Sequence, residues 1–588
     1  MPVQNVITLP QEILQRVERV LEYHQSTKAT FDTVRAESQK PDPATQPYEF
    51  RVFEMRPKVP LPAGLLDVPV ATLSLMAQGL DALPPALVGP PQDLKTLATW
   101  LHFANGIASK RRTVMQTVFT RTCASDASTF PTEMYVAAFA VEGLEPGFYH
   151  YTPREFALRK LRDGGETLAR LTRGRPDLAF LRTVPAALLV STIFCRSTWR
   201  FGKRGYRNAL HDAGYLVQNL VTVATSIGIT TMTRLHVNDT ATRELIGVPA
   251  DAEFDQAEAV HAAVIWADRA TCPMERPAAV ATSPVHNGQP SSALSGYTLS
   301  GPTGERVAEQ GGMSKAAATP IGLPLIERAS LANEVTPYVS ILSTHVDCVA
   351  PGIALREIRP PLTELTPMPP NVHVFKLPHA EQEPHGQPLR NVLLTRQPSP
   401  HFGGKAISRD AFVSINRLAF RGGTFFPLHP DGPHVALVRP FWLIHDVTGF
   451  DAGIWYYNPS TDEWTLLRHG TFRREAFYLT LEQQAFGQCA ATCFLFTNLR
   501  HLMSVTGPDI YRLAFLEAGI VTNRLALSSE ALDFAWFESG QFYDDEVRTF
   551  FGLQQSGWEP LCAVALGTRV PGDKDKTAVT GVALDWRD

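Results

Sequence analysis

The chain has 588 residues, 44% of them hydrophobic, and a formal net charge of −4. This length is too great for one hydrophobic core and predicts several domains, while a charge so close to neutral does not predict a nucleic-acid partner, which would need a basic face. Seven cysteines, odd in number and scattered, argue against a disulfide framework and favour a reducing compartment.

The N-terminal region predicts neither a secretion signal nor a membrane anchor. It has no long apolar core, it carries acidic residues early, and no run of about 18 apolar residues occurs in the chain. We therefore expect a cytoplasmic protein without a membrane partner. Residues 11–31 are expected to form an amphipathic helix with an extended tail, within an N-terminal helix and arm at residues 1–62.

Two parts of the chain are related by a nearly constant offset. VEGLEPGFYHYTP at residues 141–153 and VTGFDAGIWYYNP at residues 447–459 share Val, Gly, Gly, Tyr and Pro at an offset of 306 (447 − 141). Tyr206 and Gly214 correspond to Tyr511 and Gly519 at an offset of 305 (511 − 206). An irregular motif kept in order and spacing predicts a tandem duplication.

Each half predicts the same elements. Strands are expected at 134–141 and 441–447, at 186–194 and 491–499, and at 260–267 and 561–567, with a long amphipathic helix before the last strand of each half. This pattern predicts two α+β domains, at residues 63–270 and 336–588. Residues 271–335 are rich in Pro, Gly, Ser, Thr and Ala and predict a flexible linker.

Three ordered motifs resemble those of the SagB-type dehydrogenases, which are nitroreductase-like flavoproteins. The family pattern R..PSGGALYP.E is matched by Arg121, Ser125, Phe130, Pro131 and Glu133. The patterns V.GL.PGLYHY.P and KYG.RGYR…DAG…QNL are matched within residues 141–153 and 200–220. The resemblance covers residues 90–270 well and 375–570 more loosely. It implies two nitroreductase-like domains, each a mixed antiparallel sheet flanked by helices, that form an intramolecular pseudo-dimer in a monomeric chain.

The resemblance also implies an FMN-dependent dehydrogenase or oxidase, with FMN bound without a covalent bond at the interface. Such family members oxidise peptide thiazolines and oxazolines to thiazoles and oxazoles, so the expected substrate is a small molecule or a peptide, free or held by a carrier or synthetase. One alternative is an NAD(P)H-dependent nitro- or quinone reductase. The alternative from another class is a flavin-free scaffold that binds a peptide or a partner enzyme.

FMN needs cations for its phosphate and small residues beside its ring. By the resemblance, the first half supplies the cofactor-binding residues Arg121, Ser125, Asp126 and Ala127, and the second half supplies Arg396, Ser399, His401 and Gly540. The segment with Arg396 matches the family's RRS.R.F imperfectly, and a Pro-containing surface loop explains it equally well. Gly540 corresponds to a loop whose backbone N–H faces flavin N5.

The catalytic Lys-Tyr pair of the azoline oxidases is missing. Arg200 and Phe201 stand in its place, and an arginine stays protonated and is a poor base. Arg200 is therefore expected to bind an anionic or carbonyl group. His150, Tyr149 and Lys203 are the candidates for the missing proton acceptor, and no metal site is predicted.

The parts of the two expected flavin sites are divided unequally between the halves. LSLMAQGLDALPP in the first half has no arginine, RLHVND has no glycine, and in the second half Arg421 aligns on Ser125. One of the two possible flavin sites has nearly all of its expected residues, whereas the other lacks expected residues in both halves. We therefore expect one FMN per chain, at the interface of the halves.

Overall fold

The computed structural model describes residues 9–36, 41–51, 53–77, 89–112, 117–235, 237, 239–248, 254–267, 336–349, 373–377, 386–420 and 436–572. We call the described residues up to 267 the first half and those from 336 the second half. The predicted linker at 271–335, the segment with Arg421 and part of LSLMAQGLDALPP lie outside the described residues.

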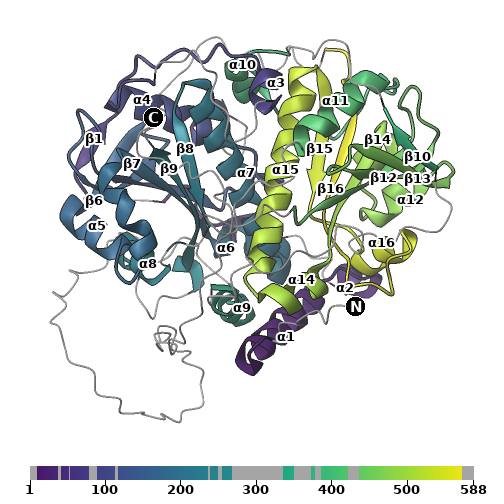
Figure 1. Ribbon diagram of the computed structural model, residues 1–588, viewed down its shortest axis with the longest axis horizontal. Coiled ribbons are helices and arrows are strands. Elements are labelled where there is room, and N and C mark those ends of the chain that lie inside the picture. The colour runs from purple at the N-terminus through teal and green to yellow at the C-terminus, as the bar shows by residue number, and fades with distance from the viewer. Residues whose placement is uncertain are drawn as a thin grey trace, which may run out of the picture.

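Each half contains one seven-stranded antiparallel sheet, and the two sheets have the same strand order (Figure 1). In the first half the order is β1-β6-β5-β4-β7-β9-β8, with bounds Lys58–Pro60, Ala157–Asp163, Gly147–Thr152, Thr132–Ala138, Ala186–Ile193, Glu258–Ala267 and Thr230–Arg234. In the second half it is β10-β13-β12-β11-β14-β16-β15, with bounds His373–Lys376, Glu463–His469, Gly453–Asn458, Arg439–Ile444, Ala491–Thr497, Glu559–Thr568 and Phe534–Ser539. A two-stranded ribbon, β2 Ile107–Arg112 and β3 Thr117–Arg121, precedes β4.

The central strands are buried on both faces. Every residue of β4, β7, β9, β11 and β14 is buried. The sequence of a strand that is covered on both faces is a continuous apolar run rather than an alternation of apolar and polar residues. The inner faces of both sheets share one hydrophobic core, and each outer face has a core of its own.

The helices cover these faces and join the halves. In the first half they are α1 Gln11–Ser26, α2 Phe31–Ala36, α3 Thr72–Ala77, α4 Leu94–Asn105, α5 Gly164–Leu171, α6 Phe194–Phe201, α7 Gly205–Ser226 and α8 Asp239–Ile246. In the second half they are α9 Val339–Val349, α10 Leu389–Thr395, α11 Arg409–Phe420, α12 Arg473–Leu479, α13 Gln484–Gln488, α14 Leu499–Thr506, α15 Ile510–Ala531 and α16 Asp544–Phe550.

Helices α7 and α15 pack against each other between the two sheets (Figure 1). All 22 residues of each helix are buried. Gly214 lies against the backbone of Leu516, and Gly519 lies against the backbone of His211. A Cβ added at either glycine would lie less than 3.0 Å from those backbone atoms, which is closer than Cβ atoms come to their neighbours in real proteins. Because only glycine permits this approach, the repeated "AG" dipeptides mark the closest contact between the halves.

The predicted fold class is confirmed: the chain has two mixed helix and antiparallel-sheet regions packed together. The expected strands are present with bounds shifted by a few residues, and the helix expected at 11–31 is divided into α1 and α2. Strand β1 belongs to the first sheet although it lies within the predicted arm. The domain boundaries themselves stay a prediction.

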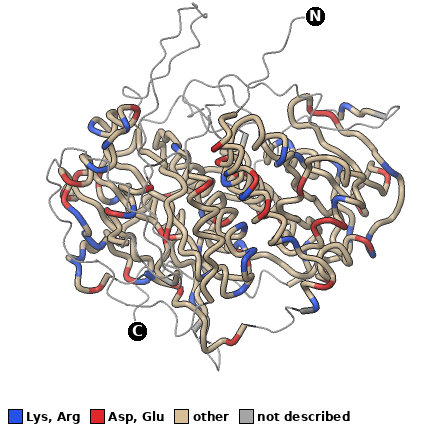
Figure 2. The backbone as a smooth tube through the Cα atoms, turned by 90° about the horizontal axis from the view of Figure 1, so that it is seen from below, with Lys and Arg blue, Asp and Glu red and all other residues tan. Residues whose placement is uncertain are grey.

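The charged residues, the helices and the cysteines of the described ranges have further common features. Lys/Arg and Asp/Glu positions are interspersed along the backbone, and no side of this view carries one sign alone (Figure 2). No helix of the described residues has the length and apolar composition needed to cross a bilayer. The six cysteines in the described ranges are all buried and form no disulfide within those ranges.

Candidate functional site

A small cavity of about 10 Å³ lies between the two halves. The first half lines it with Asp126 from the loop before β4 and with Arg207, Asn208 and His211 from α7, whereas the second half supplies Glu538, Gly540, Leu561 and Cys562 from β15, the loop after it and β16. The Ser-containing loop and the glycine loop predicted to share a flavin therefore do meet here, and each comes from a different half.

The loop at residues 125–130 is held in an unusual conformation. Ala127, Ser128 and Phe130 have φ values of 48°, 55° and 43°, in the left-handed region that favours glycine. The Ser125 hydroxyl donates to Asp212 on α7 and accepts from the Phe130 N–H at 2.9 Å. The family pattern has Gly-Gly at positions 126–127, so this chain has side chains at two positions where that pattern has none.

The Asp126 carboxylate occupies the space beside Gly540. It accepts a hydrogen bond from the Asn208 side-chain amide, and the Gly540 N–H also stabilises its charged form. A Cβ at Gly540 would lie 2.7 Å from Asn208 Nδ2 and 3.4 Å from Asp126 Oδ2. The two loops thus contact each other through Asp126, with no gap between them for a ring.

Burial and like charges make the carboxyl groups of the cavity weak acids. Burial, reinforced by the Asp212 charge, raises the pKa of Asp126 to about 6. Burial raises the pKa of Glu538 to about 8, partly opposed by His211. Burial by itself lowers the pKa of His211, but Cys562, Asp212 and Glu538 raise it well above its usual value.

Glu538→Gln is expected to change the pH dependence of stability. The folded-state pKa of Glu538 is about 8 and its ordinary value is 4.5, so its contribution to stability is complete below pH 4.5 and is lost as pH rises through 8. Because glutamine does not ionise, the variant does not lose this stability as the pH rises. Its melting temperature should therefore equal that of the parent near pH 5 and exceed it by several degrees near pH 9, as measured by calorimetry, whereas Glu142→Gln, at an exposed site, should follow the parent. A constant difference across this pH range would contradict the assignment.

Arg396, the expected phosphate ligand, is buried and bonded to protein groups. Its Nη1 donates to Asn523 Oδ1 at 3.0 Å, and its Nη2 donates to the Thr122 carbonyl at 2.6 Å and to Asn219 Oδ1 at 2.9 Å. The guanidinium also lies 5.2 Å from the ring centre of Tyr215. Only Nε lacks a partner. Arg396 therefore ties the two halves together, and little of its hydrogen-bonding capacity is left for a phosphate.

The other predicted cofactor residues have structural partners too. Arg121 donates to the Glu49 carbonyl at 2.7 Å and lies between the rings of Phe50 and Phe130. The Ser399 hydroxyl donates to the His401 carbonyl at 2.8 Å, and the Ser399 N–H donates to the Trp536 carbonyl. His401 is exposed. These residues stabilise loops at positions where flavin contacts were expected.

These residues do not fit FMN in their present arrangement. The amide expected to face flavin N5 faces Asp126, and the donors of the phosphate arginine are bonded to protein groups. The prediction of one FMN bound by residues 125–128 and 396–402 is therefore not supported at this interface. Arg421, which belongs to the second possible flavin site, lies outside the described residues.

The four candidate catalytic residues, which were predicted as a ligand-binding arginine and three alternative proton acceptors, are not brought together at the cavity. His150 is buried and its Nε2 lies 2.9 Å from Glu133 Oε2, while the Tyr149 hydroxyl donates to the Glu145 carbonyl at 2.6 Å. As neighbours on strand β5, the two side chains point to opposite faces of the sheet. Arg200 and Lys203 are exposed, away from the cavity lining.

The residues that do line the cavity were largely missed. Asn208 and His211 lie one turn apart on α7 between the matched Arg207 and Asp212, and Glu538 lies two residues before Gly540. One feature of the sequence could have pointed to this region. Asp212 and Glu517 are acidic residues at corresponding positions of the two similar stretches. Asp212 accepts from the 125–126 loop, and Glu517 accepts from the N–H groups of Leu437 and Val438.

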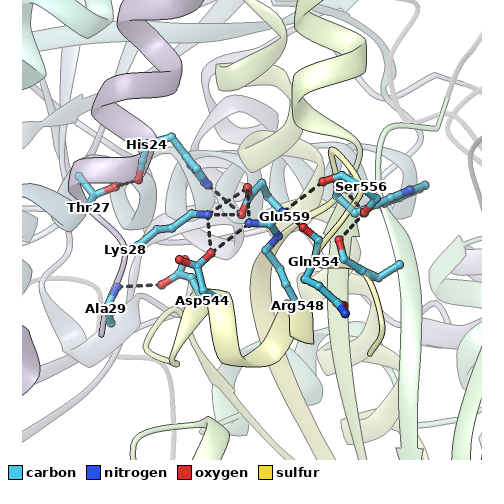
Figure 3. Close-up of polar contacts among 12 residues, drawn as sticks. His24, Thr27, Lys28, Ala29, Asp544, Arg548, Gln554, Ser556 and Glu559 are labelled. Carbon is cyan, nitrogen blue, oxygen red and sulfur yellow. Dashed lines mark hydrogen bonds and ion pairs between the residues drawn. The ribbon is translucent and has the colours of Figure 1, made fainter. Parts of the chain in front are cut away.

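A second polar cluster borders the cavity, where the chain after α1 crosses onto the second half (Figure 3). Lys28 Nζ lies 2.8 Å from Asp545 and 3.0 Å from Glu559, and the Ala29 N–H donates to Asp544 at 2.9 Å. Asp544 also pairs with Arg204 and with Arg207, which lines the cavity. These cations hold the pKa of Asp544 well below its usual value despite its burial. The cluster fixes one wall of the cavity.

Comparisons with known proteins agree with this architecture. Residues 92–261 match the family model described as Nitroreductase family. A protein of Methanocaldococcus jannaschii assigned to the nitroreductases is 28% identical over 158 residues, which are 27% of this chain and 76% of that protein.

Solved structures extend the likeness to both halves. A crystal structure of a protein from Anabaena variabilis, assigned to the nitroreductases, matches with a TM-score of 0.66 at 19% identity, covering 94% of this chain and 99% of that chain. An oxidoreductase described as containing FMN matches with a TM-score of only 0.23 at 15% identity, covering 33% of this chain and 86% of that chain. Residues 92–261 therefore carry a domain matched by the Nitroreductase family model, and the chain as a whole has a nitroreductase-like fold.

Proposed function

We propose that this chain, a tandem duplication of a nitroreductase-like domain, is a flavin-free binding protein for a peptide or small molecule. The position of Asp126 carries the proposal. Its carboxylate takes the interaction with the Gly540 amide that a flavin ring would make, and Asn208 holds it there. A partly buried carboxylate next to the flavin edge would also repel the electrons that a reduced flavin carries.

The second candidate is a SagB-like, FMN-dependent dehydrogenase acting on a thiazoline, an oxazoline or a related peptide-derived intermediate. One observation favours it, since Ser125, Arg396 and Gly540 come from distant segments to the same interface. The scattered positions of Arg200, His150, Tyr149 and Lys203 do not favour it. An NAD(P)H-dependent nitro- or quinone reductase would need the same flavin. In either proposal the partner is a small molecule or peptide, and the chain acts as a monomeric pseudo-dimer in the cytoplasm.

The flavin content of the purified chain decides between the two. We expect a colourless protein that does not quench the fluorescence of added FMN, because Asp126 fills the ring edge. Asp126→Gly restores the residue of the family pattern and is expected to gain measurable FMN quenching, while Asp451→Gly, whose side chain is 73% exposed, should behave as the parent. Recovery of one FMN per parent chain after denaturation would overturn the proposal and establish the dehydrogenase.

A further inference from the structure

Helix α9 belongs to the second half by sequence, but its buried face packs on the first half, beside α1 (Figure 1). Its His345 is 1% exposed, with Nδ1 2.9 Å from the Tyr206 hydroxyl of α7 and Nε2 3.7 Å from Asp239 Oδ1 of α8. On α1, Arg19 pairs with Asp347 of α9 at 2.6 Å. We call the groups around His345 the α9 seat: Tyr206, Asp239, His261 and Arg512.

The hydrogen bonds of the α9 seat fit neutral histidines. The Nε2 of His345 faces a carboxylate, so Nε2 carries the proton and Nδ1 accepts from the Tyr206 hydroxyl. The neighbouring ring is His261 of β9, which is fully buried and whose centre lies 5.8 Å from that of His345. Its Nδ1 lies 3.5 Å from Nη2 of Arg512, a group that can only donate, and its Nε2 lies 2.7 Å from Thr192 Oγ1. In each ring, the nitrogen that a second proton would occupy already faces a donor.

A second proton on either ring would also add positive charge to a buried site. Burial lowers the pKa of His345, and the charges of Arg512 and Arg243 act in the same direction, while Asp239 opposes them. Burial lowers the pKa of His261 well below its usual value, and Arg512 and His345 add to this effect. Both rings are therefore held neutral by their surroundings.

Two buried neutral histidines weaken the docking of α9 in acid. Their pKa is lower in the seat than the usual 6.5, so their contribution to docking is complete above pH 6.5 and is lost as the pH falls below it. Asp509, the residue before α15, acts in the opposite direction, because burial raises its pKa to about 7 although Arg512 opposes this. From pH 7.5 to 5.5, each fully affected histidine raises the undocked fraction about tenfold, and Asp509 lowers it about fourfold.

We propose that α9 is an acid-sensitive latch, which leaves its seat increasingly as the pH falls below about 6, while both sheets stay folded. Protonation of His345 and His261 drives the release. Undocking uncovers the rings of Phe194 and Tyr206, which lie 5.5 and 6.0 Å from that of His345, and removes the partner of Arg19 on α1. The latch does not depend on whether the chain binds a flavin, since none of these groups lines the cavity between the halves.

The test is hydrogen–deuterium exchange of the full chain at pH 7.5 and at pH 5.5, with protection factors corrected for the effect of pH on intrinsic exchange. We expect the protection of α9 to fall at least about tenfold at the lower pH, while β7 and β14 keep theirs. Unchanged protection of α9 would overturn the inference. An equal loss in α9 and in the two strands would also overturn it, because the whole chain would then unfold in acid.

A double variant, His261→Gln with His345→Gln, ties the response to these two rings. Glutamine does not titrate, and its amide offers an acceptor and a donor as the neutral ring does. The protection of α9 should then not fall at pH 5.5, and a fall equal to that of the parent would reject the inference. The control is His445→Gln, in the loop after β11, since burial also lowers the pKa of His445, to about 3, and this variant should respond as the parent. The measurement on the parent decides by itself if the double variant does not fold.

Discussion

Gly214→Ala is expected to destabilise the protein by at least about 3 kcal/mol, since it forces a Cβ into the backbone of the facing helix. The added Cβ would lie less than 3.0 Å from the carbonyl oxygen, the carbonyl carbon and the Cα of Leu516. A flexible side chain could rotate away, but a helix backbone moves only if α7 and α15 separate. That separation would loosen the interface that positions His211 and Asn208 for the cavity.

Gly165→Ala is the matched control for this prediction. Gly165 lies in α5, a Cβ there would meet nothing within 4 Å, and its φ is not in the left-handed region. Alanine at such a site leaves stability unchanged or raises it by roughly 0.5 kcal/mol. Calorimetric melting of both variants checks the pair. If Gly214→Ala melts within a degree of the parent, the close contact between the halves is wrong.

Asp544→Asn should cost about 3–5 kcal/mol, because it leaves two buried guanidinium groups without a counter-charge. The Asp544 side chain is fully buried and its oxygens lie 2.6 Å from Arg204 and 2.8 Å from Arg207. The substitution keeps the shape and removes the charge, so the loss reports electrostatics rather than packing. The chain after α1 should also loosen, because the Ala29 N–H bonds the same carboxylate.

The control for this second prediction is Asp451→Asn, since the Asp451 side chain is 73% exposed and its carboxylate lies 3.9 Å from His469 Nδ1. Exposed pairs of this kind contribute little, and the variant should melt like the parent. Limited proteolysis adds a readout for the N-terminal segment. Faster cleavage after α1 in Asp544→Asn is expected, and equal cleavage in both variants would show that Asp544 does not anchor this segment.

The architecture was largely determined by the sequence itself. The repeated motifs near Gly147 and Gly453, and near Gly214 and Gly519, predicted two similar halves, and the structure has two sheets of one strand order. The apolar runs of β7 and β14 predicted strands. Such signals are local or periodic, so they survive in a single sequence even when the residues between them have diverged.

The chemistry of the interface was decided only by the tertiary structure. Asp126 was predicted to bind the cofactor, but its carboxylate lies beside Gly540, which is more than 400 residues later in the chain. Arg396 was predicted to bind the phosphate. Its N–H groups instead donate hydrogen bonds to Thr122, Asn219 and Asn523. His150 matched a motif and is bonded to Glu133 inside the first half. Hydrogen bonds depend on distances of a few tenths of an ångström between groups far apart in sequence, and no local pattern encodes which donor meets which acceptor when the two halves pack together.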